Sequence, residues 1–403
     1  PSPPHLAPCP PIPMLGIYQQ QGLLKAFKAH EYVAHSTLVN CVVIGPRSGA
    51  VLATGGEDKR VNVWKVGRAS NIWSLTGNSS PIEALAFDPM EELLVSGSSG
   101  GAVKLYDLQV GKLRRNFRGH MSNVTAIEYG AFDRKFMTTG SMDTVVKLWG
   151  IDSKECAMSF KGHSSQVTAV TFSPDGFLLA SASGNGEIKL WDLRGGKLLH
   201  SFDAGPGVVK DIHFSPVEFL LAAATADRCV RLYDVESLEF FCASPPDSSP
   251  VVSLGFSSNG SEVYAASHSS LRCITWDNDT AVAQVERSGE MSWGGVQAMH
   301  ITAEKQVVAA SCASNFVTVW AVDLDDAEEP QALALPPKVR KPSRGSSRVQ
   351  GSSSNGSGGS KDHSEQKGTG LEVPSFQIRG THLGSPRLSP RVADEKVTAH
   401  PRT

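Results

Sequence analysis

Histidine, serine or threonine, and aspartate recur at fixed offsets in this sequence, and together they are the side chains of a hydrolytic triad. In the first set, Thr54 precedes Asp58 by four residues and Asp58 precedes Trp64 by six. A hydrolase would use the hydroxyl as nucleophile and the histidine as its base. The sets are His35, Thr54, Asp58 and Trp64; His120, Thr139, Asp143 and Trp149; and His163, Ser181, Asn185 and Trp191.

The repetition of this set favours a structural role over a catalytic one. A catalytic centre is expected once, in one cleft, whereas this combination recurs along the chain. The same side chains can form a buried hydrogen-bond chain from Asp through His and Ser/Thr to Trp, which satisfies polar groups and holds a turn in place. We therefore interpret the three sets as structural tetrads.

The tetrads decay in the other periods of the sequence. Gly100 stands where Asp is expected in the second period, and Ala223 replaces Ser/Thr in the fifth. In the sixth period Ser269 or Ser270 is expected at the turn position, with Trp276 one residue late. We expect the periods with incomplete tetrads to depend more on apolar packing.

The tetrads belong to a longer repeat that predicts the elements carrying them. A short apolar run ends in an aromatic residue every 42–44 residues, at Trp64, Tyr106, Trp149, Trp191, Tyr233, Trp276 and Trp320. The other runs of each period, rich in β-branched residues and separated by Gly/Asp/Ser turns, are typical of β-strands. Seven periods predict an all-β fold, a seven-bladed β-propeller. A strand within residues 21–32 is expected to complete the last blade and close the ring.

The composition changes at both ends of the repeated region. We predict a disordered Pro-rich leader over residues 1–20, the propeller over 21–325, and a disordered acidic, basic and Gly/Ser-rich linker and tail over 326–403. A basic run in the tail is either a contact for an acidic surface, such as tubulin tails or nucleic acid, or a solvated linker. Its residues are Lys338, Arg340, Lys341, Arg344 and Arg348. Ser385 and Ser389 each precede proline and are candidate phosphorylation sites.

Charge and motifs argue against several classes of function. A formal net charge of −2 argues against a globally basic nucleic-acid binder, and the sequence has no apolar run of about 18 residues to span a membrane. It has no GxxxxGK[ST] motif and no zinc-ligand spacing of Cys and His, so we expect no cofactor and no metal. Residues 97–101 match G-x-S-x-G, but a strand-like run follows where a nucleophile elbow needs a helix. A catalytic propeller would need convergent acids or histidines at its centre, which the repeats do not predict, so we expect no enzymatic activity.

The repeats resemble the WD40 family over about residues 21–325, since Gly-His, Asp and Trp-Asp recur with its spacing. In the first period, residues 32–41 (YVAHSTLVNC) and 53–64 (ATGGEDKRVNVW) look like the opening blade of the non-catalytic WD40 subunits of katanin, especially those of plants and the green lineage. Further similar stretches are residues 74–77 with 79–81, 190–193 with 196–200, and 214–222.

The resemblance implies a protein without chemistry of its own. Katanin severs microtubules with a separate AAA ATPase subunit, and its WD40 subunit targets and regulates the complex. We therefore expect as partners the katanin ATPase, microtubules or tubulin, and centrosome- or spindle-associated proteins, in the cytoplasm and on the cytoskeleton, without nucleic acid or membrane. In the family a helical C-terminal domain binds the ATPase, and we expect this chain, which ends in the linker, to be a fragment without it.

Partner binding is expected on the wider loop face of the propeller, where turn residues beside the tetrads are exposed. These residues are Glu57, Met142, Ser36, Met121 and Ser164. The alternative is a general WD40 scaffold, such as a centriolar or ubiquitin-ligase adaptor, without a role in severing.

Overall fold

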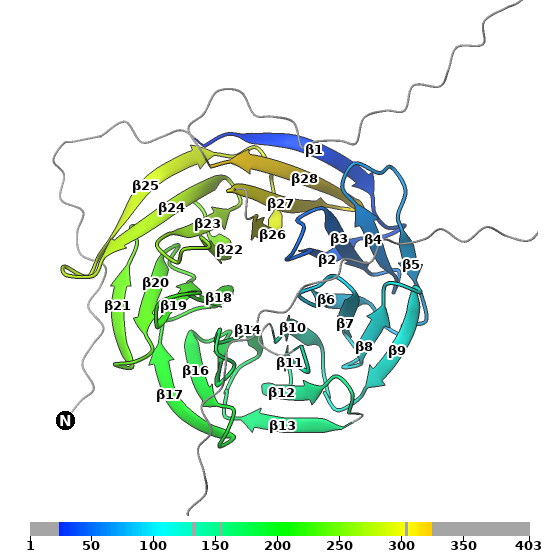
Figure 1. Cartoon of the computed structure of the whole chain (residues 1–403), viewed down its shortest axis with the longest axis horizontal. Coiled ribbons are helices and arrows are strands. Elements are labelled where there is room, and N and C mark those ends of the chain that lie inside the picture. The colour runs from blue at the N-terminus through cyan, green and yellow to red at the C-terminus, as the bar shows by residue number, and fades with distance from the viewer. Residues whose placement is uncertain (1–23, 131–133, 154, 303–304, 325–403) are drawn as a thin grey trace, which may run out of the picture. The chain divides into compact units, whose positions relative to one another are not determined.

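The computed structural model describes residues 24–130, 134–153, 155–302 and 305–324, all within the first of the two units of the chain, Pro1–Pro337. These residues form seven four-stranded antiparallel sheets, which are the blades of one ring (Figure 1). The predicted all-β, seven-bladed propeller is therefore confirmed. Within this part of the chain, no helix is long and apolar enough to cross a membrane.

Each blade is an up-and-down sheet that runs from the centre of the ring outward (Figure 1). Blades one to three consist of β2 (Val39–Ile44), β3 (Val51–Gly56), β4 (Val61–Lys65) and β5 (Trp73–Leu75); β6 (Ile82–Phe87), β7 (Leu93–Ser98), β8 (Val103–Asp107) and β9 (Lys112–Phe117); and β10 (Val124–Tyr129), β11 (Phe136–Ser141), β12 (Val145–Gly150) and β13 (Cys156–Lys161). Blades four and five consist of β14 (Val167–Phe172), β15 (Leu178–Ser183), β16 (Glu187–Asp192) and β17 (Lys197–Asp203); and β18 (Asp211–Phe214), β19 (Leu220–Ala224), β20 (Val230–Asp234) and β21 (Glu239–Ala243). Blades six and seven consist of β22 (Val251–Phe256), β23 (Val263–Ser267), β24 (Ser270–Asp277) and β25 (Val282–Glu290); and β26 (Val296–Ile301), β27 (Gln306–Ala313), β28 (Phe316–Asp323) and β1 (Ala26–Val33).

The N-terminal strand β1 closes the ring, as the sequence predicts. It pairs antiparallel with β28, with Ala26 opposite Val322 and Val33 opposite Phe316. The ends of the propeller sequence therefore share blade seven, and β28 has a partner on both sides. Pairing of this kind removes an exposed sheet edge that would otherwise be free to pair with another chain.

The apolar core lies between neighbouring blades. Val103 and Phe117 of blade two, for example, pack in one buried cluster with Val124 and Trp149 of blade three. The second and third strands of a blade, such as β7 and β8, are almost continuously buried because neighbouring blades cover both of their faces. This packing holds the loops at the strand ends in a fixed arrangement.

Two of the seven aromatic repeat residues are not at the position that the sequence spacing implies. In blades one to five the repeat aromatic pairs with the second residue of the second strand, as Trp149 does with Met137. The equivalent position can be found by following the paired residues outward from the end of the inner strand. In blade six this position is occupied by Ile274, and in blade seven it is occupied by Val322. The expectation that Trp276 lies one residue late is therefore wrong, because it lies two residues beyond Ile274. Trp320 lies two residues before Val322.

Short turns accompany these shifts in register. Only residues 268–269 separate β23 from β24, and only residues 314–315 separate β27 from β28. A shift of two residues along a strand keeps every side chain on the same face of the sheet. The apolar pattern of the sequence is therefore unchanged, although the aromatic rings move.

Candidate functional site

The tetrad of blade three is a continuous hydrogen-bond chain. His120 lies in the loop after β9, Thr139 on β11, Asp143 in the β11–β12 turn and Trp149 on β12. Trp149 Nε1 donates to Thr139 Oγ1 (2.8 Å), His120 Nε2 lies 2.7 Å from the same hydroxyl, and His120 Nδ1 lies 2.9 Å from the Asp143 carboxylate. A neutral histidine that accepts from the threonine and donates to the aspartate satisfies all four side chains.

The electrostatics of blade three agree with this assignment. Burial lowers the pKa of His120, so the ring is neutral, although the nearby Asp143 carboxylate opposes this effect. Burial would raise the pKa of Asp143, but hydrogen bonds from the Met121 N–H and from His120 outweigh it and lower this pKa. The aspartate therefore stays ionised beside a neutral histidine.

Blade one repeats the same chain with its own residues. His35 Nδ1 lies 2.8 Å from Asp58 Oδ1, and its Nε2 lies 2.9 Å from Thr54 Oγ1. Trp64 Nε1 donates to this hydroxyl over 3.1 Å. Asp58 also accepts the backbone N–H of Ser36 (3.3 Å), which fixes the loop that enters the blade.

This arrangement is suited to holding a turn rather than to catalysis. Thr54 and Thr139 are fully buried, and each hydroxyl is already engaged by a histidine and a tryptophan. A nucleophile must be reached by its substrate, and these hydroxyls are not. The G-x-S-x-G match at residues 97–101 is likewise the end of β7 and a turn into β8, in which the serine of the motif, Ser99, donates its backbone N–H to the Pro81 carbonyl (2.9 Å).

Blade four departs from the predicted tetrad. His163 Nε2 keeps its contact with Ser181 Oγ (2.6 Å), but Asn185 turns away and donates to Ser164 Oγ (2.9 Å). His163 Nδ1 is left buried without a hydrogen bond, with the Glu187 carboxylate 3.7 Å away. An amide does not carry the charge that would hold the imidazole N–H in place. Burial lowers the pKa of His163 to about 4.

Blade four should make the stability of the propeller depend on acid. His163 is neutral in the fold down to pH about 4 but protonates near pH 6.5 when unfolded. The free energy of unfolding that depends on neutral His163 is therefore fully present above pH 6.5. It decreases as the pH falls toward 4, by up to about 3 kcal/mol. Urea unfolding across this range measures the loss. Asn185→Asp supplies a carboxylate for His163 Nδ1 and should reduce it, and equal losses in both proteins would contradict this account.

The candidate partner-binding residues all lie on one loop face of the propeller. Glu57 and Met142 are in turns between the second and third strands of their blades, whereas Ser36, Met121 and Ser164 follow fourth strands. In an antiparallel blade the second and fourth strands end at the same edge of the sheet. The Met121 side chain is 91% exposed and Met142 is 47% exposed. Both flank the Asp143 turn, because the Met121 N–H donates to Asp143 and Met142 precedes it. Ser36 and Ser164 instead hydrogen-bond to tetrad residues.

The tail residues singled out from the sequence lie outside the described part of the chain. They are the basic residues Lys338, Arg340, Lys341, Arg344 and Arg348 and the serines Ser385 and Ser389.

The innermost strands carry a group of acids and a histidine that the repeats did not predict. Glu128 on β10 accepts the Phe172 N–H (2.7 Å), and Asp211 on β18 accepts the Leu254 N–H (2.8 Å). Burial raises the pKa of Glu128 to about 7. Burial opposes protonation of His213, but Asp211, 3.4 Å away, raises the pKa of that histidine to about 9. Each carboxylate thus joins its strand to the inner strand of the next blade.

A second group of ligand-type side chains lies in blade six. One ligand atom from each of Glu262, Cys273 and Glu286 lies within 4.8 Å of the others. Glu262 accepts the Tyr264 hydroxyl (2.6 Å), and Arg287 lies 3.6 Å from the same carboxylate. Burial raises the pKa of the Cys273 thiol to about 11. A protonated thiol and an engaged carboxylate form a hydrogen-bonded cluster rather than a ready metal site.

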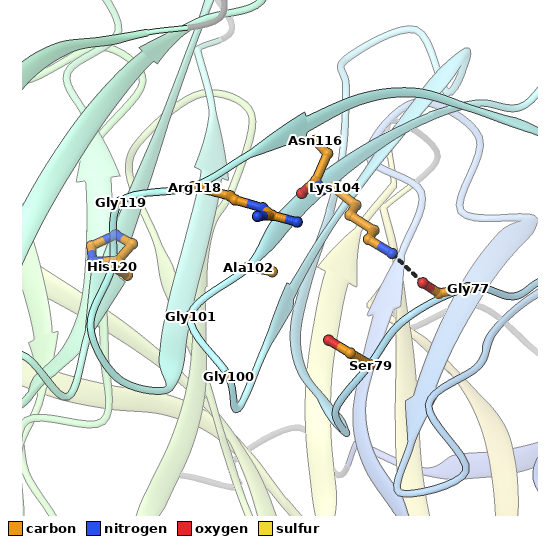
Figure 2. A pocket seen from close by; sticks show the side chains of 10 residues that line it. All are labelled: Gly77, Ser79, Gly100, Gly101, Ala102, Lys104, Asn116, Arg118, Gly119 and His120. Carbon is orange, nitrogen blue, oxygen red and sulfur yellow. Dashed lines mark hydrogen bonds between the residues drawn. The ribbon is translucent and has the colours of Figure 1, made fainter.

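Blade two contains a pocket that sequence reasoning missed. Its volume is about 450 Å³, and its charged side chains are Lys104 and Arg118 (Figure 2). It opens beside Gly100, where blades one and three have an aspartate. The missing tetrad acid was visible in the sequence, but the position of the two cations around the gap was not.

Comparison with known families and proteins agrees with this architecture. The WD40 family, described as WD domain, G-beta repeat, matches residues 24–65, 154–192 and 196–234. Each match begins at the outer strand of one blade and continues through three strands of the next. These three segments of the chain are therefore similar to WD40 repeats. The Anaphase-promoting complex subunit 4 WD40 domain family also matches the chain, over residues 48–132.

Several similar proteins are named Katanin p80 WD40 repeat-containing subunit B1, or its homolog. The Arabidopsis thaliana homolog is 48% identical over 77 residues, which are 19% of this chain and 9% of the relative. The protein of Danio rerio is 44% identical over 81 residues (20% and 12%), and that of Gallus gallus is 49% identical over 71 residues (18% and 11%). The aligned segments are thus a small part of each relative. These matches support a katanin p80-type WD40 subunit.

Proposed function

We propose that this chain is a non-catalytic WD40 scaffold that targets and regulates a katanin microtubule-severing complex. Its partners would be the katanin AAA ATPase, microtubules or tubulin, and centrosome- or spindle-associated proteins, and it would act in the cytoplasm on the cytoskeleton. The similarity to katanin p80 subunits supports the choice of complex. The buried hydroxyls of the tetrads support a role in binding rather than in chemistry.

The observation that carries the binding role is the methionine pair of blade three. Met121, in the loop after β9, is almost fully exposed, and Met142, in the β11–β12 turn, is about half exposed. Methionine side chains are unbranched and polarisable, so they adapt to the surface of a partner. Hydrogen bonds hold the backbone of both residues, from the Met121 N–H to Asp143 and from the Met142 N–H to the Asn123 carbonyl, which lowers the conformational entropy lost on binding. Glu57 and Ser36 at blade one and Ser164 at blade four extend the proposed surface over other blades.

The tail would add a second, electrostatic contact. The five cations from Lys338 to Arg348 would attract acidic surfaces such as tubulin tails. Phosphorylation of Ser385 and Ser389 would reduce the net positive charge of the tail and weaken the attraction.

Co-sedimentation with microtubules, with and without a katanin ATPase subunit, tests the proposal. The full chain should pellet with microtubules, or change severing when the ATPase is present. Replacing both Met121 and Met142 with aspartate should reduce the effect by about tenfold if these side chains form the centre of the interface. Met90→Asp is the matched control, because Met90 is 43% exposed in the turn between β6 and β7 on the opposite edge.

Two results would contradict parts of the proposal. If the full chain neither pellets nor changes severing, the katanin role fails, and the alternative is a general WD40 scaffold, for example a centriolar or ubiquitin-ligase adaptor. If the double variant and the Met90 control behave alike, the blade-three face is not the contact.

A further inference from the structure

The pocket of blade two lies on the loop face, between the β7–β8 turn and the loop that leads from β9 into blade three (Figure 2). Gly100, Gly101 and Ser79 form one part of its wall, and Lys104, Asn116 and Arg118 form another. Its volume of about 450 Å³ is within the range of ligand-binding sites. None of its lining residues is acidic.

Lys104 is the buried cation of the pocket. Only 9% of its surface is exposed, and its Nζ donates to the Gly77 carbonyl (2.5 Å). Burial, with a smaller contribution from the nearby Arg118, lowers the pKa of Lys104. A buried ammonium group without a counterion is unfavourable, and an anion in the pocket would remove that cost.

The lysines at the equivalent position of other blades have different partners. In blade four, Lys189 forms an ion pair with Glu187 (2.5 Å) and donates to Ser201 (3.1 Å). In blade two, Ala102 occupies the position that Glu187 has in blade four, so Lys104 lacks this carboxylate. Asn116 occupies the position of Ser201 and lines the pocket.

Arg118 adds a second cation at the same opening. Its side chain is exposed, and with the described part of the chain it makes no hydrogen bond or ion pair. Figure 2 shows the guanidinium group directed toward the space beside Ala102 and Lys104. A guanidinium group offers paired donors that match a carboxylate or a phosphate, and the lysine adds a point charge.

The pocket exists because the tetrad of blade two has lost its acid. In blade three the Asp143 carboxylate spans from its turn to His120 and to the Met121 N–H. In blade two Gly100 replaces this acid and Ser79 stands at the position of Met121. Both residues line the resulting space. Beside this space the Ser80 hydroxyl accepts the Gly100 N–H (3.1 Å), and the rest of the pocket offers room for a carboxylate supplied from outside.

We propose that this pocket binds the oxyanion of an acidic side chain, a glutamate, aspartate or phosphorylated serine, in a peptide segment of a partner protein. The inference rests on the proposed function for the choice of a protein partner, whereas the shape and charge of the pocket are independent of it. A peptide held here would continue over the loop that carries Met121, because Gly119 and His120 line the pocket. The acid would fix the position of the segment, and the methionines would contact its apolar side chains.

Fluorescence anisotropy with the full chain tests the proposal. The probes are labelled Gly/Ser peptides with a central block of glutamate, of phosphoserine or of glutamine. The glutamate or phosphoserine peptide should bind, more weakly at high salt, and the glutamine peptide should not. Arg118→Gln and Lys104→Gln should each weaken binding by about tenfold. Gly100→Asp, which restores the acid of the tetrad, should abolish binding.

Controls separate the pocket from charge in general. Arg68→Gln removes an exposed cation from the β4–β5 turn on the opposite edge and should leave binding unchanged. Equal affinities for the glutamine peptide, or for Gly100→Asp and the natural chain, would overturn the proposal. Inorganic phosphate that binds as tightly as the phosphoserine peptide would show a site for free anions and would also overturn it.

The peptide assay contains no microtubules, so the two proposals can fail separately. Peptide binding without microtubule co-sedimentation or altered severing would leave the pocket assignment standing and remove the katanin role. Co-sedimentation without peptide binding would leave the katanin role standing and remove the pocket assignment.

Discussion

Deletion of residues 1–33 is expected to abolish cooperative folding of the propeller. The deletion removes β1 and its seven register pairs with β28, and it removes the buried side chains of Leu24 and Tyr32. Each large buried side chain contributes about 2 kcal/mol, and the lost strand pairing adds to this. The total is comparable with the whole stability of a typical domain, about 5–15 kcal/mol. Thermal unfolding followed by circular dichroism should show no sharp transition.

The control for this deletion is a chain that begins at Leu24. It retains β1 and every described contact of that strand, so it should unfold as sharply as the natural chain. The protein without residues 1–33, unlike this control, should also aggregate, because the unpaired edge of β28 is free to pair with another molecule. A soluble, cooperatively folded protein without residues 1–33 would show that closure by β1 is dispensable.

The substitution Asp143→Ala is expected to destabilise the propeller by about 3 kcal/mol. The buried His120 Nδ1 and the Met121 N–H both lose their acceptor, and an unsatisfied buried donor costs about 1–3 kcal/mol. Urea unfolding at neutral pH measures the difference. Gly100→Ala, at the same turn position of blade two, is the comparison. The new methyl group would meet only the Ser80 side chain, whose hydroxyl, 2.9 Å away, would have to shift slightly, so a change below about 1 kcal/mol is expected.

A second comparison tests whether the charge of Asp143 matters. Asp143→Asn reproduces the arrangement of blade four, where Asn185 leaves His163 Nδ1 without a partner. Its stability should therefore fall between those of the natural chain and Asp143→Ala. If Asp143→Ala and Gly100→Ala melt at the same temperature, the tetrads contribute no more than an ordinary turn.

Much of the fold was predictable because the repeat is periodic. Each period can bury its apolar faces only against its neighbours, so seven periods imply seven blades and a closed ring. The role of β1 followed from the likeness of its segment to the other fourth strands. Register was not predictable to the residue, because Trp276 and Trp320 keep the alternation of their strands although they are displaced from the repeat position.

The candidate site was predictable only in part. Residue type and spacing indicated the hydrogen-bond chains of blades one and three. Spacing alone also predicted a complete chain in blade four, but the amide of Asn185 turns toward Ser164, because it lacks the charge that would hold His163. Glu128 and His213 come together only through the curvature of the ring, which no local pattern encodes.

The number of blades, the strands within them and the structural interpretation of the His/Ser/Asp sets can be derived from local periodicity and residue type. Which polar groups are satisfied, and where space remains, depends on how the blades pack. The loss of one acid at Gly100 is a single letter in the sequence. A basic pocket forms there because folding brings together Lys104 from β8 and Arg118 from the loop after β9, beside the turn that lacks the acid.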